Sequence, residues 1–192
     1  MLKITIIAIL ALASAATDED SKDRLLLIIL EAKNRAFDQV QTIKMLAATN
    51  VDKFTVRVTE MVEKSRSDME ILQKELINTN DVCDKAKNNI DDAALKTIAH
   101  FQFCVEKITD AVDSDMNSLA FEGSLLTKEI QNTKTINDDV LQHKVTDFDT
   151  KSFQFANYVQ KLEKCETQSN LLRLKRQISE TLTSYKQCLQ DK

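Results

Sequence analysis

Apolar residues recur every three or four positions along most of the chain, which is the spacing of a helix with one buried face. Three such stripes occupy residues 25–76, 83–130 and 141–189. The first reads Leu25, Ile28, Ala32, Ala36, Val40, Ile43, Ala47, Val51, Phe54, Val58, Val62, Met69, Leu72 and Leu76. The second reads Cys83, Ala86, Ile90, Ala94, Ile98, Phe101, Val105, Ile108, Val112, Met116, Leu119, Gly123, Leu126 and Ile130, and the third Leu141, Val145, Phe148, Phe155, Val159, Leu162, Cys165, Leu172, Leu182, Tyr185 and Leu189. The pattern predicts an all-α fold.

Two polar segments divide the stripes, at residues 78–81 and 132–138. Asn, Asp and Thr side chains bond their own backbone and favour helix ends over helix interiors. Thr49 and Asn50 mark a weaker boundary inside the first stripe, which would give a fourth helix. The unbroken phase across Asn50 favours one helix from about Asp20 to Leu76. We expect an elongated antiparallel bundle of three or four long, coiled-coil-like helices in a single domain over residues 17–192.

Composition agrees with this interpretation. The 192 residues include one glycine and no proline, whereas strands joined by tight turns need such residues. With 43% hydrophobic and 29% charged residues, the chain has the composition of a globular protein.

The four cysteines lie almost symmetrically about residue 135, with Cys83 and Cys188 outside and Cys104 and Cys165 inside. Four cysteines allow three connectivities. A helical hairpin over residues 83–188 favours the nested pairs Cys83–Cys188 and Cys104–Cys165. The alternative of two local bridges would have to span a helix about 30 Å long between Cys83 and Cys104.

One spacing fits this hairpin poorly. Cys165 and Cys188 are 23 positions apart, which places them on different faces of a straight helix. The third helix must therefore bend or slip near residues 168–170, or its last turn must fray.

Residues 1–16 resemble a secretory signal peptide. Lys3 precedes an apolar run at residues 4–12, and small residues at 13–16 offer cleavage sites. The apolar run is too short to span a bilayer, and no later segment suits one. We therefore expect a secreted, extracellular protein in an oxidising compartment, where paired cysteines form disulfides.

The net charge of the chain and the distribution of its charged residues argue against two classes of partner. Loss of residues 1–16 removes only Lys3 and changes the net charge from −4 to −5. Charges of both signs are interspersed, which argues against a nucleic-acid surface or attraction to anionic lipid. The basic cluster at residues 173–176 is interpreted as a solvated helix face.

Candidate catalytic or metal chemistry is sparse. His100 and Cys104 lie four apart on one helix face, but a disulfide cysteine beside a surface histidine is the preferred interpretation, and His143 stands alone. Asp110, Asp113 and Asp115 lack the glycine and terminal glutamate of an EF-hand loop. The phenylalanines at 101, 103, 148, 153 and 155 are interpreted as core. We therefore expect no catalytic, cofactor-binding or metal-ligating residue, and no enzyme activity.

Gly123 lies on the second apolar stripe, where glycine costs about 1 kcal/mol relative to alanine. The hairpin register sets it opposite Phe148, so the missing side chain would make room for that ring. The alternative is a helix end at Gly123, with a new segment beginning at Ser124.

The cysteine framework, the long helices and the segment Phe101-Gln102-Phe103-Cys104-Val105-Glu106-Lys107-Ile108 resemble the insect TsetseEP-domain family of secreted proteins. The resemblance covers residues 83–188. The name-giving member carries a Glu-Pro repeat tail that this proline-free chain lacks, and the resemblance brings no catalytic residues.

Two functional classes remain. The first is a non-enzymatic interaction module that binds an unknown protein or surface partner, or itself, in insect gut lumen or body fluid. The second is an extracellular carrier of lipid or another apolar ligand. Two bridges across the longest hairpin would oppose the opening that a helical carrier needs, so the carrier ranks second.

Overall fold

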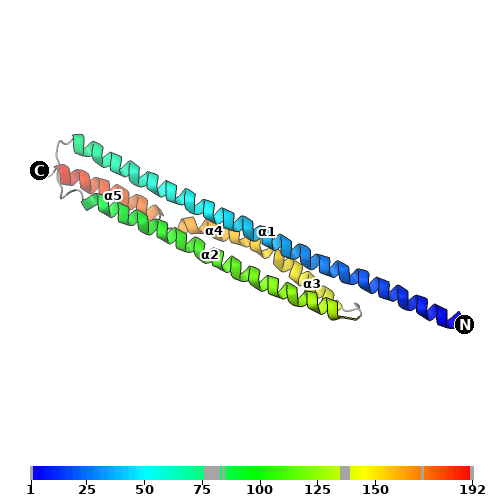
Figure 1. Cartoon of the computed structure of the whole chain (residues 1–192). Coiled ribbons are helices and arrows are strands. Elements are labelled where there is room, and N and C mark those ends of the chain that lie inside the picture. The colour runs from blue at the N-terminus through cyan, green and yellow to red at the C-terminus, as the bar shows by residue number, and fades with distance from the viewer. Residues whose placement is uncertain (1, 76–82, 84, 135–138, 170, 191–192) are drawn as a thin grey trace. The chain divides into compact units, whose positions relative to one another are not determined.

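A computed structural model describes residues 2–75, 83, 85–134, 139–169 and 171–190, with side chains from Glu19 onward except those of Ala86, Lys87 and Gln168. Structural statements below refer to these residues. The elements are α1 (Leu2–Glu75), α2 (Lys85–Asn132), α3 (Asp139–Ser152), the 3₁₀ helix η1 (Gln154–Ala156), α4 (Asn157–Gln168) and α5 (Leu171–Gln190), as Figure 1 shows. The all-α prediction is confirmed. The break predicted at 78–81 lies outside the described residues, and the break at 132–138 falls between the end of α2 and the start of α3.

Helix α1 continues through Thr49 and Asn50, as the unbroken apolar phase indicated. The Thr49 hydroxyl donates to the Met45 carbonyl four residues earlier, at 2.9 Å, and so bonds inside the helix. The helix begins at Leu2 instead of near Asp20. Residues 11–16 are rich in alanine, the strongest helix former, so no local signal stops the helix there.

The chain divides into two compact units, which are described separately. Unit 1 comprises Met1–Thr42 and Ala111–Tyr158, and unit 2 comprises Ile43–Asp110 and Val159–Lys192. We expected a single domain over residues 17–192, and this stays a prediction.

Unit 1 packs the first part of α1, the end of α2, and α3 with η1. Lys144 pairs with Glu129, and Lys151 with Glu122, each at 2.6 Å, so α2 and α3 are antiparallel. Arg35 joins α1 to α3 through Asp149 at 2.8 Å. The buried apolar residues are Leu25, Ile29, Ala32, Ala36, Val40, Val112, Leu119, Leu126, Ile130, Leu141, Val145, Phe148, Phe155 and Tyr158. The ion pairs contribute little energy in exposed positions, so this core holds the unit together.

The 3₁₀ helix η1 lies between α3 and α4, within the third apolar stripe. The sequence pattern did not predict this interruption. The Ala156 amide donates to the Phe153 carbonyl at 3.3 Å, a bond between residues three apart. Three residues per turn keep positions three apart on one side of the chain. Ser152, Phe155 and Tyr158 are consequently all buried. The Ser152 hydroxyl donates to the Asp149 carbonyl at 2.6 Å, which satisfies the buried polar group.

Unit 2 packs the second part of α1 against the first part of α2 and against α4 and α5. Disulfides join Cys83 to Cys188 and Cys104 to Cys165, with Cα separations of 6.1 and 5.7 Å. The nested pairing is therefore present, all four cysteines are bonded, and α2 is antiparallel to α4 and α5. The buried apolar residues are Ile43, Ala47, Phe54, Val58, Val62, Met69, Cys83, Ile90, Ala94, Phe101, Val105, Leu162, Cys165, Leu171, Leu174, Tyr185 and Leu189.

The register of α1 against α2 in unit 2, which the sequence left open, is set by two contacts. The rings of Phe54 and Phe101 stack with their centroids 4.1 Å apart. Arg66 pairs with Asp91 at 2.6 Å. In both contacts the residue numbers rise along one helix and fall along the other, so α1 and α2 run antiparallel here.

The break predicted near residues 168–170 is present, since α4 ends at Gln168 and α5 begins at Leu171. The buried Ser169 hydroxyl donates to the Glu166 carbonyl at 2.5 Å. The change of phase corrects one prediction: Leu172 is 80% exposed, whereas Leu171 and Leu174 are buried.

The first stripe contains a similar one-residue error. Ile29 is 2% exposed and belongs to the core, whereas Ile28, the residue chosen from the spacing, is 37% exposed. Residues 25–30 are apolar throughout, so the sequence alone left the inward position ambiguous there.

Candidate functional site

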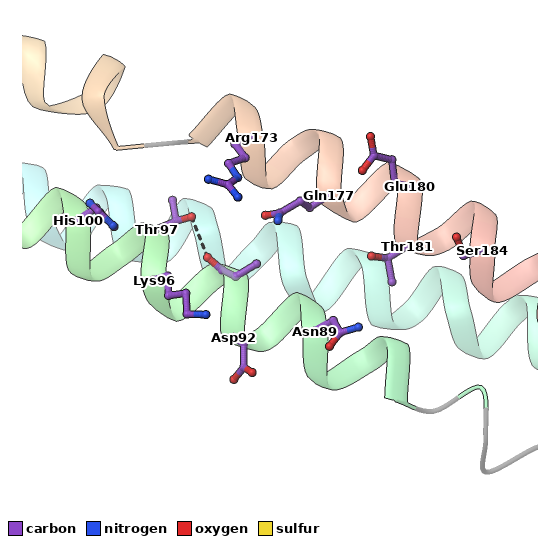
Figure 2. Close-up of a pocket in the computed structure, with 11 residues that line it drawn as sticks. Asn89, Asp92, Lys96, Thr97, His100, Arg173, Gln177, Glu180, Thr181 and Ser184 are labelled. Carbon is purple, nitrogen blue, oxygen red and sulfur yellow. Dashed lines mark hydrogen bonds between the residues drawn. The ribbon is translucent and has the colours of Figure 1, made fainter.

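A groove of about 600 Å³ lies between α2 and α5 in unit 2 (Figure 2). Ligand pockets in proteins typically measure ~300–1,000 Å³. The lining residues are polar except for Ala93: Asn89, Asp92, Ala93, Lys96, Thr97 and His100 from α2, and Arg173, Gln177, Glu180, Thr181 and Ser184 from α5. The buried faces of packed helices are normally apolar, so a polar lining sets this groove apart from the core beside it.

The groove lies beside a part of α5 that has no buried residue. Between Leu174 and Tyr185 the residues Gln177, Ile178, Thr181 and Leu182 are half-buried and the rest are exposed. On α2 the buried position between Ala94 and Phe101 is Thr97. The side chains that line the groove from both helices are therefore mainly polar.

Thr97 lies on the floor of the groove. Thr97 as a whole is 4% exposed, and its hydroxyl donates a hydrogen bond to the Ala93 carbonyl at 2.8 Å. The bond satisfies the donor within the helix. The hydroxyl oxygen retains acceptor capacity toward the groove.

The two disulfides lie beyond opposite ends of the groove. Cys83–Cys188 lies past the end that holds Asn89 and Ser184, and Cys104–Cys165 lies past the end that holds His100. Each bridge joins two segments of the chain covalently and so limits how far they can separate beyond that end of the groove.

Charged residues of both signs line the groove. Asp92, Lys96 and His100 are spaced four apart on one face of α2, while Arg173 and Glu180 lie seven apart on α5. In Figure 2 Asp92 and Lys96 lie along the part of α2 that faces Arg173 and Gln177, whereas Glu180 lies farther along α5. The two signs are therefore mixed along the groove.

Most of these charges have no competing partner. Glu180 accepts a long ion pair of 3.6 Å from Arg176, which is outside the groove. Within the described part of the chain, Arg173, Lys96 and Asp92 form no ion pair. Among the described residues of unit 2, none forms an ion pair with these three side chains that would compete with a ligand.

The candidates singled out from the sequence are placed differently. Cys104 is bonded to Cys165 and so cannot act as a thiolate ligand. His100 lines the groove, and His143 is exposed on α3. Asp115 accepts the Tyr158 hydroxyl at 2.5 Å. Searching the described residues finds no group of three or more His, Cys, Asp and Glu side chains that could hold a metal ion.

The phenylalanines divide into two groups. Phe101, Phe148 and Phe155 are buried, as expected, whereas Phe103 and Phe153 are more than half exposed. Cations cover both exposed rings: Lys107 lies 4.5 Å from the centre of Phe103, and Arg35 lies 4.0 Å from that of Phe153. The prediction of a core role for these two was wrong.

Sequence reasoning missed the groove. The basic cluster at residues 173–176 was interpreted as a solvated face, yet Arg173 extends toward α2 (Figure 2). The sequence holds no clear signal for the groove. Leu174, Ile178 and Leu182 continue an apolar spacing of four through this part of the chain.

No family model, curated protein or solved structure matches this chain. In the described part of the chain, no helix combines the length and apolar character needed to cross a membrane.

Proposed function

We propose that this chain is a secreted, non-enzymatic interaction module of the TsetseEP-domain type, acting in an extracellular fluid. The observation that carries the proposal is the polar groove between α2 and α5, which has a disulfide beyond each end. Binding costs less when a site is formed beforehand, because fewer groups must be ordered. The same disulfides support an oxidising, extracellular location.

The test compares the wild-type chain with a variant whose groove is blocked. Ala93 is the smallest lining residue and is half-buried on α2, so Ala93→Arg should fill the groove. Both proteins are expressed through a secretory pathway, immobilised, and exposed to extracellular fluid. Retained molecules are then identified by mass spectrometry.

We expect a retained component that the wild type binds and Ala93→Arg does not. Lys175→Gln, an exposed change on α5 outside the groove, serves as the matched control and should retain it. Identical retention by the groove-blocked variant would contradict the proposal. Absence of the chain from the medium, or cleavage far from residues 13–16, would contradict the secretory part.

A second candidate function is the transport of an apolar ligand. A shallow pocket of about 330 Å³ lies between α1 and α2 in unit 2, lined by Val58, Thr59, Val62, Glu63, Arg66, Asp91, Ala94, Leu95 and Ile98. Leu95 is 66% exposed at its edge. Lipid extraction of the secreted protein followed by mass spectrometry tests this function, and a stoichiometric lipid would place the carrier first.

A further inference from the structure

Helix α1 has a second stripe in unit 1, besides the stripe that packs into the core. Its members follow one another at alternating steps of three and four residues: Leu27, Leu30, Asn34, Phe37 and Gln41. We call them the outer stripe. All five are exposed, and the three apolar ones are each more than half exposed. Alternating steps of three and four keep residues on one face of a helix, and they are the spacing of the a and d positions of a coiled coil.

The apolar members of the outer stripe form a group. Residues 25–30 are apolar on every side of the helix, whereas a surface helix normally has one apolar face and one polar face. The inner side of this segment packs in the core, while Leu27 and Leu30 remain outside. Phe37 lies one heptad after Leu30 on the same face. Exposed apolar residues grouped in this way mark an interaction surface.

Asn34 indicates what kind of partner covers this surface. With Leu27 at an a position, Asn34 occupies the next a position and lies between Leu30 and Phe37. A single Asn at an a position specifies the register and the number of strands of a coiled coil. Its amide needs a hydrogen-bonding partner when it is buried, and the Asn34 of an identical facing helix supplies one. A lipid surface would leave the amide without a partner, which is unfavourable.

The flanking charges favour one orientation of the two helices. Lys33 occupies the g position before Asn34, and Asp38 occupies the e position after Phe37. In a parallel pair, the g position of one copy lies beside the following e position of the other, so Lys33 would meet Asp38. In an antiparallel pair g lies beside g and e beside e, so like charges would meet. The charge pattern is therefore complementary to a parallel copy of the same helix.

We propose that unit 1 binds a second copy of this chain through the outer stripe of α1, as a parallel two-stranded seam. The proposal goes beyond the groove, which lies in unit 2, and does not depend on it. From Leu27 to Gln41 the stripe is about 21 Å long at 1.5 Å per residue. A seam of two heptads with three apolar members per copy falls in the class of small interfaces, below about 1,200 Å² in total, which are typically weak and reversible.

The test is sedimentation velocity of the disulfide-bonded protein over a series of concentrations. We expect the wild type to pass from monomer to dimer as concentration rises. Leu30→Glu combined with Phe37→Glu should weaken the association tenfold or more, because it places charges in the seam. Phe121→Glu is the matched control, since Phe121 is an exposed phenylalanine on α2 in unit 1 outside the outer stripe. This control should associate as the wild type does.

Charge reversals test the orientation. Lys33→Glu alone and Asp38→Lys alone should each weaken association, because each places like charges side by side in a parallel pair. The two reversals combined in one chain should restore it. In an antiparallel pair each single reversal would exchange one pair of like charges for another and change little. Unchanged unfolding transitions in all variants keep the comparison free of folding defects.

Three results would overturn the proposal. The first is a wild type that stays monomeric at every concentration, and the second is equal association by the wild type and the Leu30→Glu, Phe37→Glu variant. The third is binding of the monomeric wild type to phosphatidylcholine vesicles that this variant loses, which would assign the outer stripe to a lipid surface. None of these results decides the proposed function, which depends on the separate comparison of the wild type with Ala93→Arg.

Discussion

Gly123 on α2 lies directly against the ring of Phe148 on α3. A β-carbon placed on Gly123 would come within 2.8 Å of Phe148 Cζ and 3.1 Å of Cε2. Helix α2 continues through this position to Asn132, so the interpretation of Gly123 as a helix end was wrong. The glycine is retained in the helix because the fully buried aromatic ring occupies the space of a side chain.

We predict that Gly123→Ala lowers the free energy of unfolding by about 1–3 kcal/mol through overpacking. The Phe148 ring is enclosed and cannot move aside without disturbing the core of unit 1. Phe148→Leu in the alanine background should recover part of the loss, which a double-mutant cycle in chemical denaturation measures. Ser124→Ala, an exposed neighbour on the same helix, is the control and should change stability little. A coupling energy of zero would contradict the packing explanation.

Tyr158 provides a prediction about alkaline pH. Burial, the hydrogen bond to Asp115 and the negative charge of that carboxylate together raise the pKa of Tyr158 to about 12. An unfolded tyrosine ionises near pH ~10. The folded state therefore keeps the proton longer, and its contribution to stability is complete below pH ~10 and is lost as pH rises toward ~12.

We expect wild-type stability to fall more steeply between pH ~10 and ~12 than that of Tyr158→Phe, which has no phenol to ionise at this position. Ultraviolet titration of the folded protein should show a phenol that ionises near pH 12 in the wild type and not in Tyr158→Phe. Parallel pH profiles for the two proteins would contradict the shift. Asp115→Asn, which removes the carboxylate charge, should lower the pKa of Tyr158.

The disulfides predict a large effect of reduction. The bridges close loops with sequence separations of 105 and 61 residues, and long loops confine the unfolded chain most. Removing either bridge by paired Cys→Ser substitution should lower the free energy of unfolding by about 2–5 kcal/mol. Non-reducing peptide mapping checks the connectivity, and a Cys83–Cys104 peptide would contradict the hairpin.

Small-angle scattering tests the predicted elongated shape. A helix with the 48 residues of α2 is about 72 Å long at 1.5 Å per residue. A compact protein of this length would have a radius of gyration near 16 Å. We expect a clearly larger value and a rod-like profile, and a value near the compact one would contradict the prediction.

The helices and the cysteine pairing could be predicted because they depend on regular spacing. Apolar residues at every third or fourth position predict helices, and the positions of the four cysteines, Cys83, Cys104, Cys165 and Cys188, favour one helical hairpin. The same spacing failed wherever the backbone left regular α geometry. Leu172 was predicted to be buried from its spacing along a continuous helix. It is exposed because the break after Gln168 changes the rotation of the following helix, and no local sequence signal gives the size of that change.

The groove could not be predicted for a related reason. Arg173 and His100 are ordinary surface residues when each helix is considered alone. They line one cavity only because α5 restarts at Leu171 in a phase that turns Arg173 toward α2. A site that depends on the rotation of one helix against another requires coordinates.

The nested pairing also constrains the order in which the chain can be oxidised. During synthesis Cys83 and Cys104 both emerge before either native partner. Once α2 has formed, Lys85 and Cys104 are about 28 Å apart along the helix, so Cys83, two residues before Lys85, cannot reach bonding distance of Cys104. Formation of the helix thus prevents the non-native Cys83–Cys104 bridge. Because Cys165 is synthesised before Cys188, the inner native pair can form before the outer one.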